Sequence, residues 1–311
     1  MRSLAIGVDV GGSHISCAAC DLSKKNYLTE TYSENPLNNQ GTLDEIMAVW
    51  SQTIGQTIRK TGVENIAGIG FAMPGPFDYA NGIALFKGDV KKYESLYGHN
   101  ISYILKEELD LPNDFPVRYI NDATAFALGE DWLGKTCGFT RSLSITLGTG
   151  FGSAFLKNHR PVVSGDEVPA TGAVWHLPFG DGNADDYFST RGLLNRYQIR
   201  TRQELSGVKE LAALASSDET ARDLFVDFGY KMGVFLKPWI EKSGTEILVI
   251  GGNISNAFHL FGKHLQDYFA ENDLHIPIEV SELKETASMI GSAILADDFY
   301  YQQIRPLLSE M

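Results

Sequence analysis

Cysteine, positive charge and long apolar runs are all scarce in this chain of 311 residues. Its three cysteines, Cys17, Cys20 and Cys137, are too few for a disulfide framework, which favours a reducing compartment such as the cytoplasm. Lysine and arginine number 26 against 39 aspartates and glutamates, and the net charge of −13 opposes binding to nucleic acid or an anionic membrane. No segment reaches the ~18 apolar residues of a membrane-spanning helix, and residues 1–8 lack the pattern of a secretory signal. We therefore expect a cytoplasmic globular protein without a nucleic-acid or membrane partner.

The length suggests about two domains, at roughly 150 residues per domain. Short apolar runs alternate with stretches of helical periodicity, an order typical of α/β architecture. Residues 3–10 and 15–21 predict two strands joined by a glycine turn, and residues 142–147 and 153–156 repeat this arrangement, so we expect two related halves. The other expected elements are helices over residues 43–61, 101–109, 123–133, 221–243 and 286–308, and strands over residues 66–73, 117–120 and 246–250.

The two glycine turns are the first candidates for a ligand site. In residues 9–13 (DVGGS) the glycines allow backbone N–H groups to approach an oxyanion, Ser13 adds a hydroxyl, and Asp9 is a carboxylate for Mg²⁺ or a metal-bound water. Residues 148–150 (GTG) carry the same parts around Thr149. Either turn alone is more commonly a tight hairpin, but the pair predicts a clamp on the phosphates of ATP. ATP and Mg²⁺ are therefore the expected cofactors.

Two formal matches to other nucleotide-binding motifs fail on their context. Residues 129–136 fit the phosphate-loop pattern G-x-x-x-x-G-K-[ST], but they close a predicted helix and carry two acidic residues where phosphates would lie. Residues 148–152 resemble a dinucleotide fingerprint, but the chain continues as a strand and offers no helix N-terminus for a pyrophosphate. We therefore expect neither a P-loop nor a Rossmann domain.

Asp122 is the candidate catalytic base. It follows the predicted strand 117–120 and precedes the predicted helix 123–133, so it lies where open α/β sheets place ligand groups. A carboxylate there can accept the hydroxyl proton of a substrate during phosphoryl transfer. The alternative is that Asp122 only N-caps the helix. Spacing alone leaves both interpretations open.

Taken in order, these segments resemble the ROK family of sugar kinases, in the actin-like ATPase superfamily, over nearly the whole chain. The segments that carry the resemblance are residues 9–13 (DVGGS), 71–76 (FAMPGP), 119–130 (YINDATAFALGE), 146–152 (TLGTGFG) and 250–254 (IGGNI). The resemblance implies an α/β, two-lobed actin-like (ribonuclease H-like) fold with ATP in an interlobe cleft. The first lobe would hold residues 1–120, with the terminal helix 287–311 packing back on it, and the second lobe residues 121–286.

The resemblance also implies a function and a set of site residues. The reaction would be ATP- and Mg²⁺-dependent phosphorylation of a hexose or hexose derivative at O6, with Asp122 as general base and Asp9 meeting Mg²⁺ through water or nucleotide. The implied phosphate contacts are Asp9, Gly11, Gly12, Ser13, Gly148, Thr149 and Gly150, the adenosine-side contacts are Gly251, Gly252 and Asn253, and the sugar contacts are Gly75, Asn121, Asp122, His176 and Asp185. We also expect a homodimer. The alternative is a non-catalytic sugar-binding or regulatory protein of the same fold, which has no need of a base.

The chain departs from the family in its sugar loop. Residues 172–176 (GAVWH) stand where the family carries G-E-I-G-H, so a family glutamate falls on Ala173, while His176 is kept. The cysteine zinc loop of the family is replaced by residues 179–186 (FGDGNADD), and a second family glutamate aligns with Asp185. Since no cysteine follows position 137, no zinc site is expected. We expect packing to order the loop instead, with Trp175 buried against a helix that begins near Ser189.

Overall fold

The computed structural model describes residues 3–88 and 92–311, and the chain divides into two compact units. Unit 1 comprises Met1–Cys137 and Glu285–Met311, and unit 2 comprises Gly138–Lys284. The expected division lay between residues 120 and 121. Instead α3 (Asp122–Leu133) belongs to unit 1, because it packs on α9 (Thr286–Ala293) in the segment of chain that returns to this unit.

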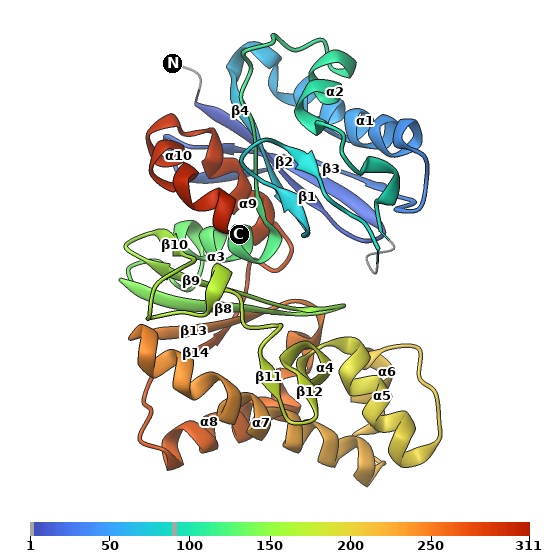
Figure 1. Ribbon diagram of the computed structural model, residues 1–311, viewed down its shortest axis with the longest axis vertical. Coiled ribbons are helices and arrows are strands. Elements are labelled where there is room, and N and C mark those ends of the chain that lie inside the picture. Colours follow the sequence, from blue (N-terminus) through green and yellow to red (C-terminus); the bar gives the residue numbers. More distant parts are fainter. Residues whose placement is uncertain (1–2, 89–91) are drawn as a thin grey trace. The chain divides into compact units, whose positions relative to one another are not determined.

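Unit 1 is built on a five-stranded sheet in the order β3-β2-β1-β4-β7. The first three strands are antiparallel neighbours, whereas β1, β4 and β7 run parallel. On one face α1 packs on β2 and β3, and on the other α9 packs on β1 and β4 (Figure 1). The strands are β1 (Leu4–Val10), β2 (His14–Asp21), β3 (Asn26–Pro36), β4 (Ile66–Met73) and β7 (Val117–Asn121), with a small hairpin of β5 (Phe77–Asp78) and β6 (Ile83–Ala84). The remaining helices are α1 (Leu43–Thr61), α2 (Ile101–Glu108) and α10 (Asp298–Ile304).

α1 shows how local sequence sets these elements. The Thr42 side chain accepts a hydrogen bond from the Glu45 N–H, and the Glu45 carboxylate accepts one from the Thr42 N–H, which forms a capping box. Trp50 and Ile54 repeat at helical spacing on the buried face. Gly62, at φ +80°, follows the last turn in a conformation that favours glycine. The helix expected over residues 43–61 is therefore confirmed.

Glycines bring α9 into backbone contact with the elements on both sides of it. A Cβ added to Gly7 in β1 would lie 1.7 Å from the Met289 carbonyl oxygen, and one added to Gly129 in α3 would lie 2.0 Å from the Ala287 carbonyl oxygen. Gly291 in α9 itself approaches α3 as closely. Because any side chain larger than hydrogen would separate these elements, the position of α9 is fixed by the glycines.

The helix expected over residues 286–308 is wrong in its length. α9 ends at Ala293, residues 294–296 form a 3₁₀ turn, and α10 begins at Asp298. The Asp297 carboxylate accepts a hydrogen bond from the Tyr300 N–H at 2.8 Å, which caps a new helix at this point. Apolar periodicity continues across the break, so the pattern alone did not reveal it.

Unit 2 repeats the sheet of unit 1, with the order β10-β9-β8-β13-β14. As in unit 1, the first three strands along the chain, β8, β9 and β10, are antiparallel neighbours, whereas β8, β13 and β14 run parallel. The strands are β8 (Arg141–Leu147), β9 (Phe151–Lys157), β10 (Arg160–Val162), β13 (Ile247–Gly251) and β14 (Ile278–Val280). The expectation of two related halves is therefore confirmed.

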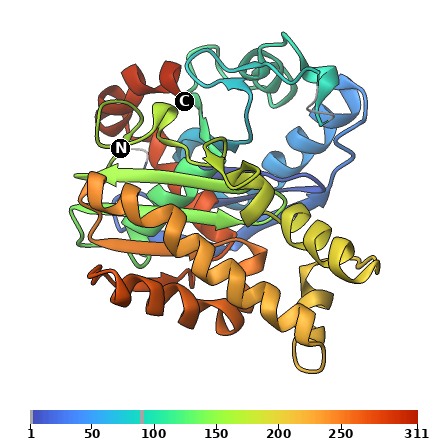
Figure 2. The ribbon, with the colours of Figure 1, turned by 60° about the horizontal axis from the view of Figure 1, so that its bottom comes forward.

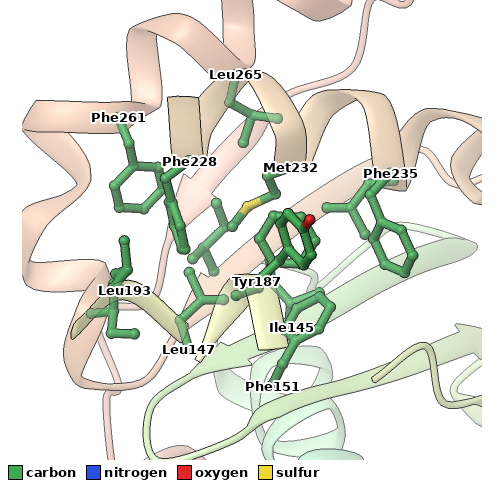
Figure 3. Packing of buried hydrophobic residues seen from close by; sticks show 14 of the residues in the cluster. Ile145, Leu147, Phe151, Tyr187, Leu193, Phe228, Met232, Phe235, Phe261 and Leu265 are labelled. Atoms are coloured by element: carbon green, nitrogen blue, oxygen red, sulfur yellow. The ribbon is translucent and has the colours of Figure 1, made fainter. Parts of the chain in front are cut away.

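The helices of unit 2 enclose an aromatic core against this sheet. α7 and α8 lie side by side (Figure 2). Phe151 from β9, Tyr187 from α4 and Phe235 from α7 belong to one buried cluster (Figure 3). The helices are α4 (Ala184–Phe188), α5 (Thr190–Thr201), α6 (Val208–Leu214), α7 (Glu219–Ser243) and α8 (Phe258–Glu271), and a short hairpin of β11 (Pro178–Phe179) and β12 (Gly182–Asn183) precedes them. Of the helices that the structure describes, none is both long and apolar enough to cross a membrane.

Candidate active site

The β1–β2 turn of unit 1 carries the first glycine motif. The Gly11 N–H donates to the His14 carbonyl at 3.0 Å, whereas the N–H groups of Gly12 and Ser13 donate to no acceptor within residues 3–88 and 92–311. These two groups are therefore available to an anion. Backbone N–H groups exposed by a glycine turn are a common phosphate-binding device.

Asp9 is the residue before the last in β1, close to this turn, and is partly buried. The pKa of its carboxyl is raised to about 7. Burial is the largest cause, and the negative charges of Asp122 and Glu285 add to it. Glu285 directly precedes α9, so the glycine contacts of that helix bring a carboxylate from the far end of the chain to Asp9. A bound cation would offset this accumulation of negative charge.

Asp122 is the first residue of α3, directly after β7. The N-cap is Asn121, whose Oδ1 accepts hydrogen bonds from the Ala123 N–H at 3.1 Å and the Thr124 N–H at 3.2 Å. The alternative interpretation of Asp122 as the N-cap is therefore wrong. Its own Oδ1 accepts from the Ala123 N–H at 2.8 Å and from the Asn121 amide at 3.1 Å, while its Oδ2 accepts no hydrogen bond from any other residue of the described part of the chain. One carboxylate oxygen is held, and the other is available to a substrate hydroxyl.

The pKa of Asp122 lies above its ordinary value because burial disfavours the charged form. The Ala123 N–H, the Asn121 amide and the ammonium of Lys92 each oppose this rise. A raised pKa makes a carboxylate a stronger proton acceptor. The environment of Asp122 therefore suits a general base.

Tyr79, which the sequence did not single out, connects two of the motifs in unit 1. Its hydroxyl donates to the Met73 carbonyl at 3.2 Å and accepts from the Asn121 amide at 3.3 Å. A Cβ on Gly75 would lie 3.4 Å from the same hydroxyl oxygen. The structure thus brings Gly75 and Asn121 together around Tyr79, and both donors of the Asn121 amide have partners within the protein.

The β8–β9 turn of unit 2 carries the second glycine motif, and the segment containing α4 and α5 holds it. The Phe151 N–H donates to Asp185 Oδ1 at 2.7 Å, and the Thr190 N–H donates to the Gly148 carbonyl at 2.8 Å. A Cβ on Gly148 would meet no atom within 4 Å, so packing does not require glycine there. Glycine at this position, with Thr149 exposed beside it, leaves room for a ligand to approach the backbone.

The last residue of β13 and the residues after it lie at the same edge of this sheet. Gly251 is opposite Thr146 of β8 in the parallel register. Gly252 has a φ of +79°, and a Cβ there would lie 2.4 Å from the Leu147 carbonyl oxygen, so only glycine fits. Asn253 follows, exposed, at the start of a 3₁₀ turn. The structure therefore places the expected adenosine-side residues next to the second glycine turn.

The two expected sugar-contacting residues of unit 2, Asp185 and His176, lie in different surroundings. Both oxygens of Asp185 have protein partners, because Oδ2 pairs with Arg191 at 3.0 Å while Oδ1 holds the glycine turn. His176 is exposed, with its ring 5.3 Å from that of Trp175. Trp175 is 49% exposed, so its expected burial is wrong. Val174 is the buried residue, whereas Trp175 lies in a turn in which the Leu177 N–H donates to the Val174 carbonyl at 3.1 Å.

Backbone pairing and an aromatic stack hold the segment that replaces the cysteine loop. The Ala184 N–H donates to the Leu177 carbonyl at 3.0 Å, and the Tyr187 hydroxyl donates to Asp181. The Tyr187 ring also carries the Arg196 guanidinium 3.6 Å from its centroid. In the chain as described, no group of three or more His, Cys, Asp or Glu side chains could hold a metal ion. The zinc content of the protein itself stays a prediction.

Comparisons with known proteins agree with this arrangement. The glucokinase of Thermotoga maritima is 27% identical over 320 aligned residues, which cover 93% of this chain and 95% of that protein. The N-acetyl-D-glucosamine kinase of Salmonella paratyphi C is 24% identical, over 80% of this chain and 84% of that one. The crystal structure of a ROK family glucokinase from Streptomyces griseus, in complex with glucose and AMPPNP, superposes with a TM-score of 0.73 at 20% identity, over 94% of this chain and 98% of that chain. The model of the ROK family matches residues 5–299, and the chain therefore belongs to the ROK family, with its actin-like α/β fold.

Proposed function

We propose that this protein transfers the γ-phosphoryl group of ATP to the O6 hydroxyl of a hexose or hexose derivative, with Asp122 as general base. The observation that carries this proposal is the Asp122 carboxylate, which has one oxygen held by the start of α3 and the other open. The similarity to a glucokinase and an N-acetyl-D-glucosamine kinase supports the hexose class. A protein that only bound sugar would have no need of a partly buried carboxylate with a raised pKa.

Different groups of the protein perform separate parts of this reaction. The sugar oxygen attacks the γ-phosphorus while its proton passes to Asp122 Oδ2, and the bond to the bridging oxygen breaks with its electron pair leaving on ADP. The hydrogen bonds to Oδ1 fix the carboxylate while Oδ2 takes the proton. The N–H groups of Gly12 and Ser13 bind phosphate oxygens.

Asp9 fits a place beside Mg²⁺. A hard cation prefers oxygen ligands, and the raised pKa of Asp9 marks negative charge that a cation would stabilise. Since the described residues hold no three-ligand group, Asp9 would meet the ion through water or together with the nucleotide. When bound, Mg²⁺ neutralises phosphate charge.

The general base is tested with Asp122→Asn, which keeps the size of the side chain and removes its ability to accept the proton. We expect kcat to fall by about 10² to 10⁴-fold in a coupled assay of ADP release, while calorimetry shows that the sugar still binds. Asp114→Asn, at an exposed position of unit 1, is the matched control with the same change of charge. Retention of at least half the wild-type rate in Asp122→Asn would remove Asp122 from the mechanism.

The sugar is tested with the same assay across a panel of hexoses and N-acetylhexosamines. Glucose and N-acetylglucosamine are the first two to compare, because Ala173 stands where the family has a glutamate. The corresponding 6-deoxy sugar should bind without supporting ADP release, since it lacks the attacking hydroxyl. A phosphorylated 6-deoxy sugar among the products would show that another hydroxyl is phosphorylated.

A further inference from the structure

Lys92 and Tyr93 lie against the β1–β2 glycine turn, although 82 residues separate Tyr93 from Gly11. The Tyr93 hydroxyl donates to the Gly11 carbonyl, and its N–H donates to the Asn39 carbonyl at 2.7 Å. The Asn39 amide in turn donates to the Gly12 carbonyl. Three segments of unit 1 therefore meet at the tip of this turn.

Tyr93 is the anchor that fixes this segment. Its side chain is fully buried, with its ring 6.0 Å from that of Trp50 and 5.4 Å from that of Phe86. Its backbone is left-handed, at φ 60°, a conformation that a bulky residue adopts only where the surrounding structure holds it. The backbone next to Lys92 is therefore held in place, and the lysine side chain starts from a defined position.

The Lys92 ammonium lies directly above the glycine turn. Its nitrogen is 3.0 Å from the position that a Cβ on Gly12 would take. The same charge acts on Asp122 and lowers its pKa. Within residues 3–88 and 92–311, no carboxylate lies within ion-pair distance of this ammonium. The cation thus lies by the open N–H groups of the turn and within electrostatic reach of the candidate base.

This part of unit 1 is otherwise strongly negative. Asp9 lies near both Asp122 and Glu285, and a triphosphate brings several further negative charges. During transfer the charge of the phosphoryl group is spread over its three equatorial oxygens. A fixed cation beside those oxygens stabilises the transition state more than the ground state, because it needs no reorganisation as the charge develops.

We propose that the Lys92 ammonium contacts the phosphoryl group as it passes from ATP to the sugar and stabilises its negative charge. This inference rests on the proposed function, and it adds to it a second residue that acts on the reacting atoms. The oxygen–phosphorus bond forms and the bond to ADP breaks as before, with the proton on Asp122 and the electron pair on ADP. Lys92 keeps all its protons throughout and acts only through its charge and its hydrogen bonds.

The test compares Lys92→Gln, which removes the charge, with Lys92→Arg, which keeps it. For Lys92→Gln we expect kcat to fall by about 10² to 10³-fold, the range for loss of one such donor. The sugar KM should change by less than about threefold, since the lost contact is made in the transition state. The kcat of Lys92→Arg should be at least about tenfold higher than that of Lys92→Gln, because the guanidinium also binds phosphate. Lys106→Gln, in which an exposed ammonium that donates to the Asn113 carbonyl is lost, is the control and should retain wild-type kcat.

Each result separates this inference from the function on which it rests. A wild-type protein that releases no ADP with any sugar of the panel would overturn the proposed function, and the role of Lys92 with it. An active wild type whose Lys92→Gln variant keeps half its kcat would overturn the role of Lys92 alone. So would a rise in sugar KM at unchanged kcat, which would make Lys92 a sugar contact. A Lys92→Arg variant no faster than Lys92→Gln, with both melting as the wild type does, would also overturn the role of its charge.

Discussion

Substituting a single glycine by alanine should have opposite effects at two helical positions of unit 1. At Gly129 the new Cβ would lie 2.0 Å from the Ala287 carbonyl oxygen, so α3 and α9 must separate by more than an ångström. α9 cannot yield, because a Cβ position on Gly70 in β4 is only 1.8 Å from the Ser292 carbonyl on its other side. At Gly55 in α1 the nearest atoms to a new Cβ are the end of the Arg59 side chain at 3.4 Å and a Leu109 methyl carbon at 3.7 Å, which are ordinary or yielding contacts.

The magnitudes follow from these distances. Overpacking a rigid contact costs about 3 kcal/mol, and the better helix propensity of alanine returns about 1 kcal/mol. Gly129→Ala should therefore lower the free energy of unfolding by about 2 kcal/mol. Gly55→Ala should raise the free energy of unfolding by about 0.4 to 1 kcal/mol, because alanine has fewer unfolded conformations to lose.

Urea unfolding followed by far-ultraviolet circular dichroism measures both variants against the wild type. The midpoint should move to lower urea for Gly129→Ala and to higher urea for Gly55→Ala, with unchanged slopes. A Gly129→Ala variant as stable as the wild type would refute the claim that glycine fixes α9. A Gly55→Ala variant as unstable as Gly129→Ala would show that the distances do not decide the sign.

Two further predictions concern metal and pH. Elemental analysis of the purified protein should find no stoichiometric zinc, because residues 172–188 offer no thiolate, and one zinc per chain would contradict this. Because folding raises the pKa of Asp9 above its unfolded value to about 7, Asp9 contributes stability at low pH that is lost as pH rises through about 7. Without Mg²⁺ or nucleotide, the wild type should therefore lose thermal stability relative to Asp9→Asn between about pH 4 and 7, and a constant difference across that range would contradict the raised pKa.

Local sequence patterns were sufficient to predict most elements of the fold. The first strands, the glycine turns and the helix after Asn121 were predictable because each depends on residues within a few positions of one another, such as Thr42 and Glu45 at the start of α1. The break before α10 was not, because one capping aspartate, Asp297, outweighs an apolar pattern that continues past it. The unit boundary also differed, since α3 joins unit 1 through contact with α9, more than 150 residues further along the chain.

In the candidate site, too, the sequence predicted residues that depend on local patterns and missed those that depend on the folded chain. Asp9 was found because it lies beside a glycine turn at the end of a predicted strand, and Asp122 because it directly follows one. Lys92 and Tyr79 were missed, since both lie in loops without periodicity and act on residues that only the folded chain brings close. Asp185 was singled out for the sugar, but its contact with the Phe151 N–H is visible only once β9 and α4 are in place.

The return of the chain to unit 1 sets an order for folding during synthesis. α9 contacts β1, β4 and α3, yet it leaves the ribosome only after all of residues 138–284 have been made. At about 5 to 20 residues per second this takes roughly 7 to 30 s, during which the glycine-bearing face of the first sheet lacks its covering helix. Unit 2 is continuous in sequence and needs no later segment. Unit 2, whose residues are translated after most of unit 1, is therefore the first unit that can complete its fold. The nascent unit 1 must remain incompletely packed until α9 has been made.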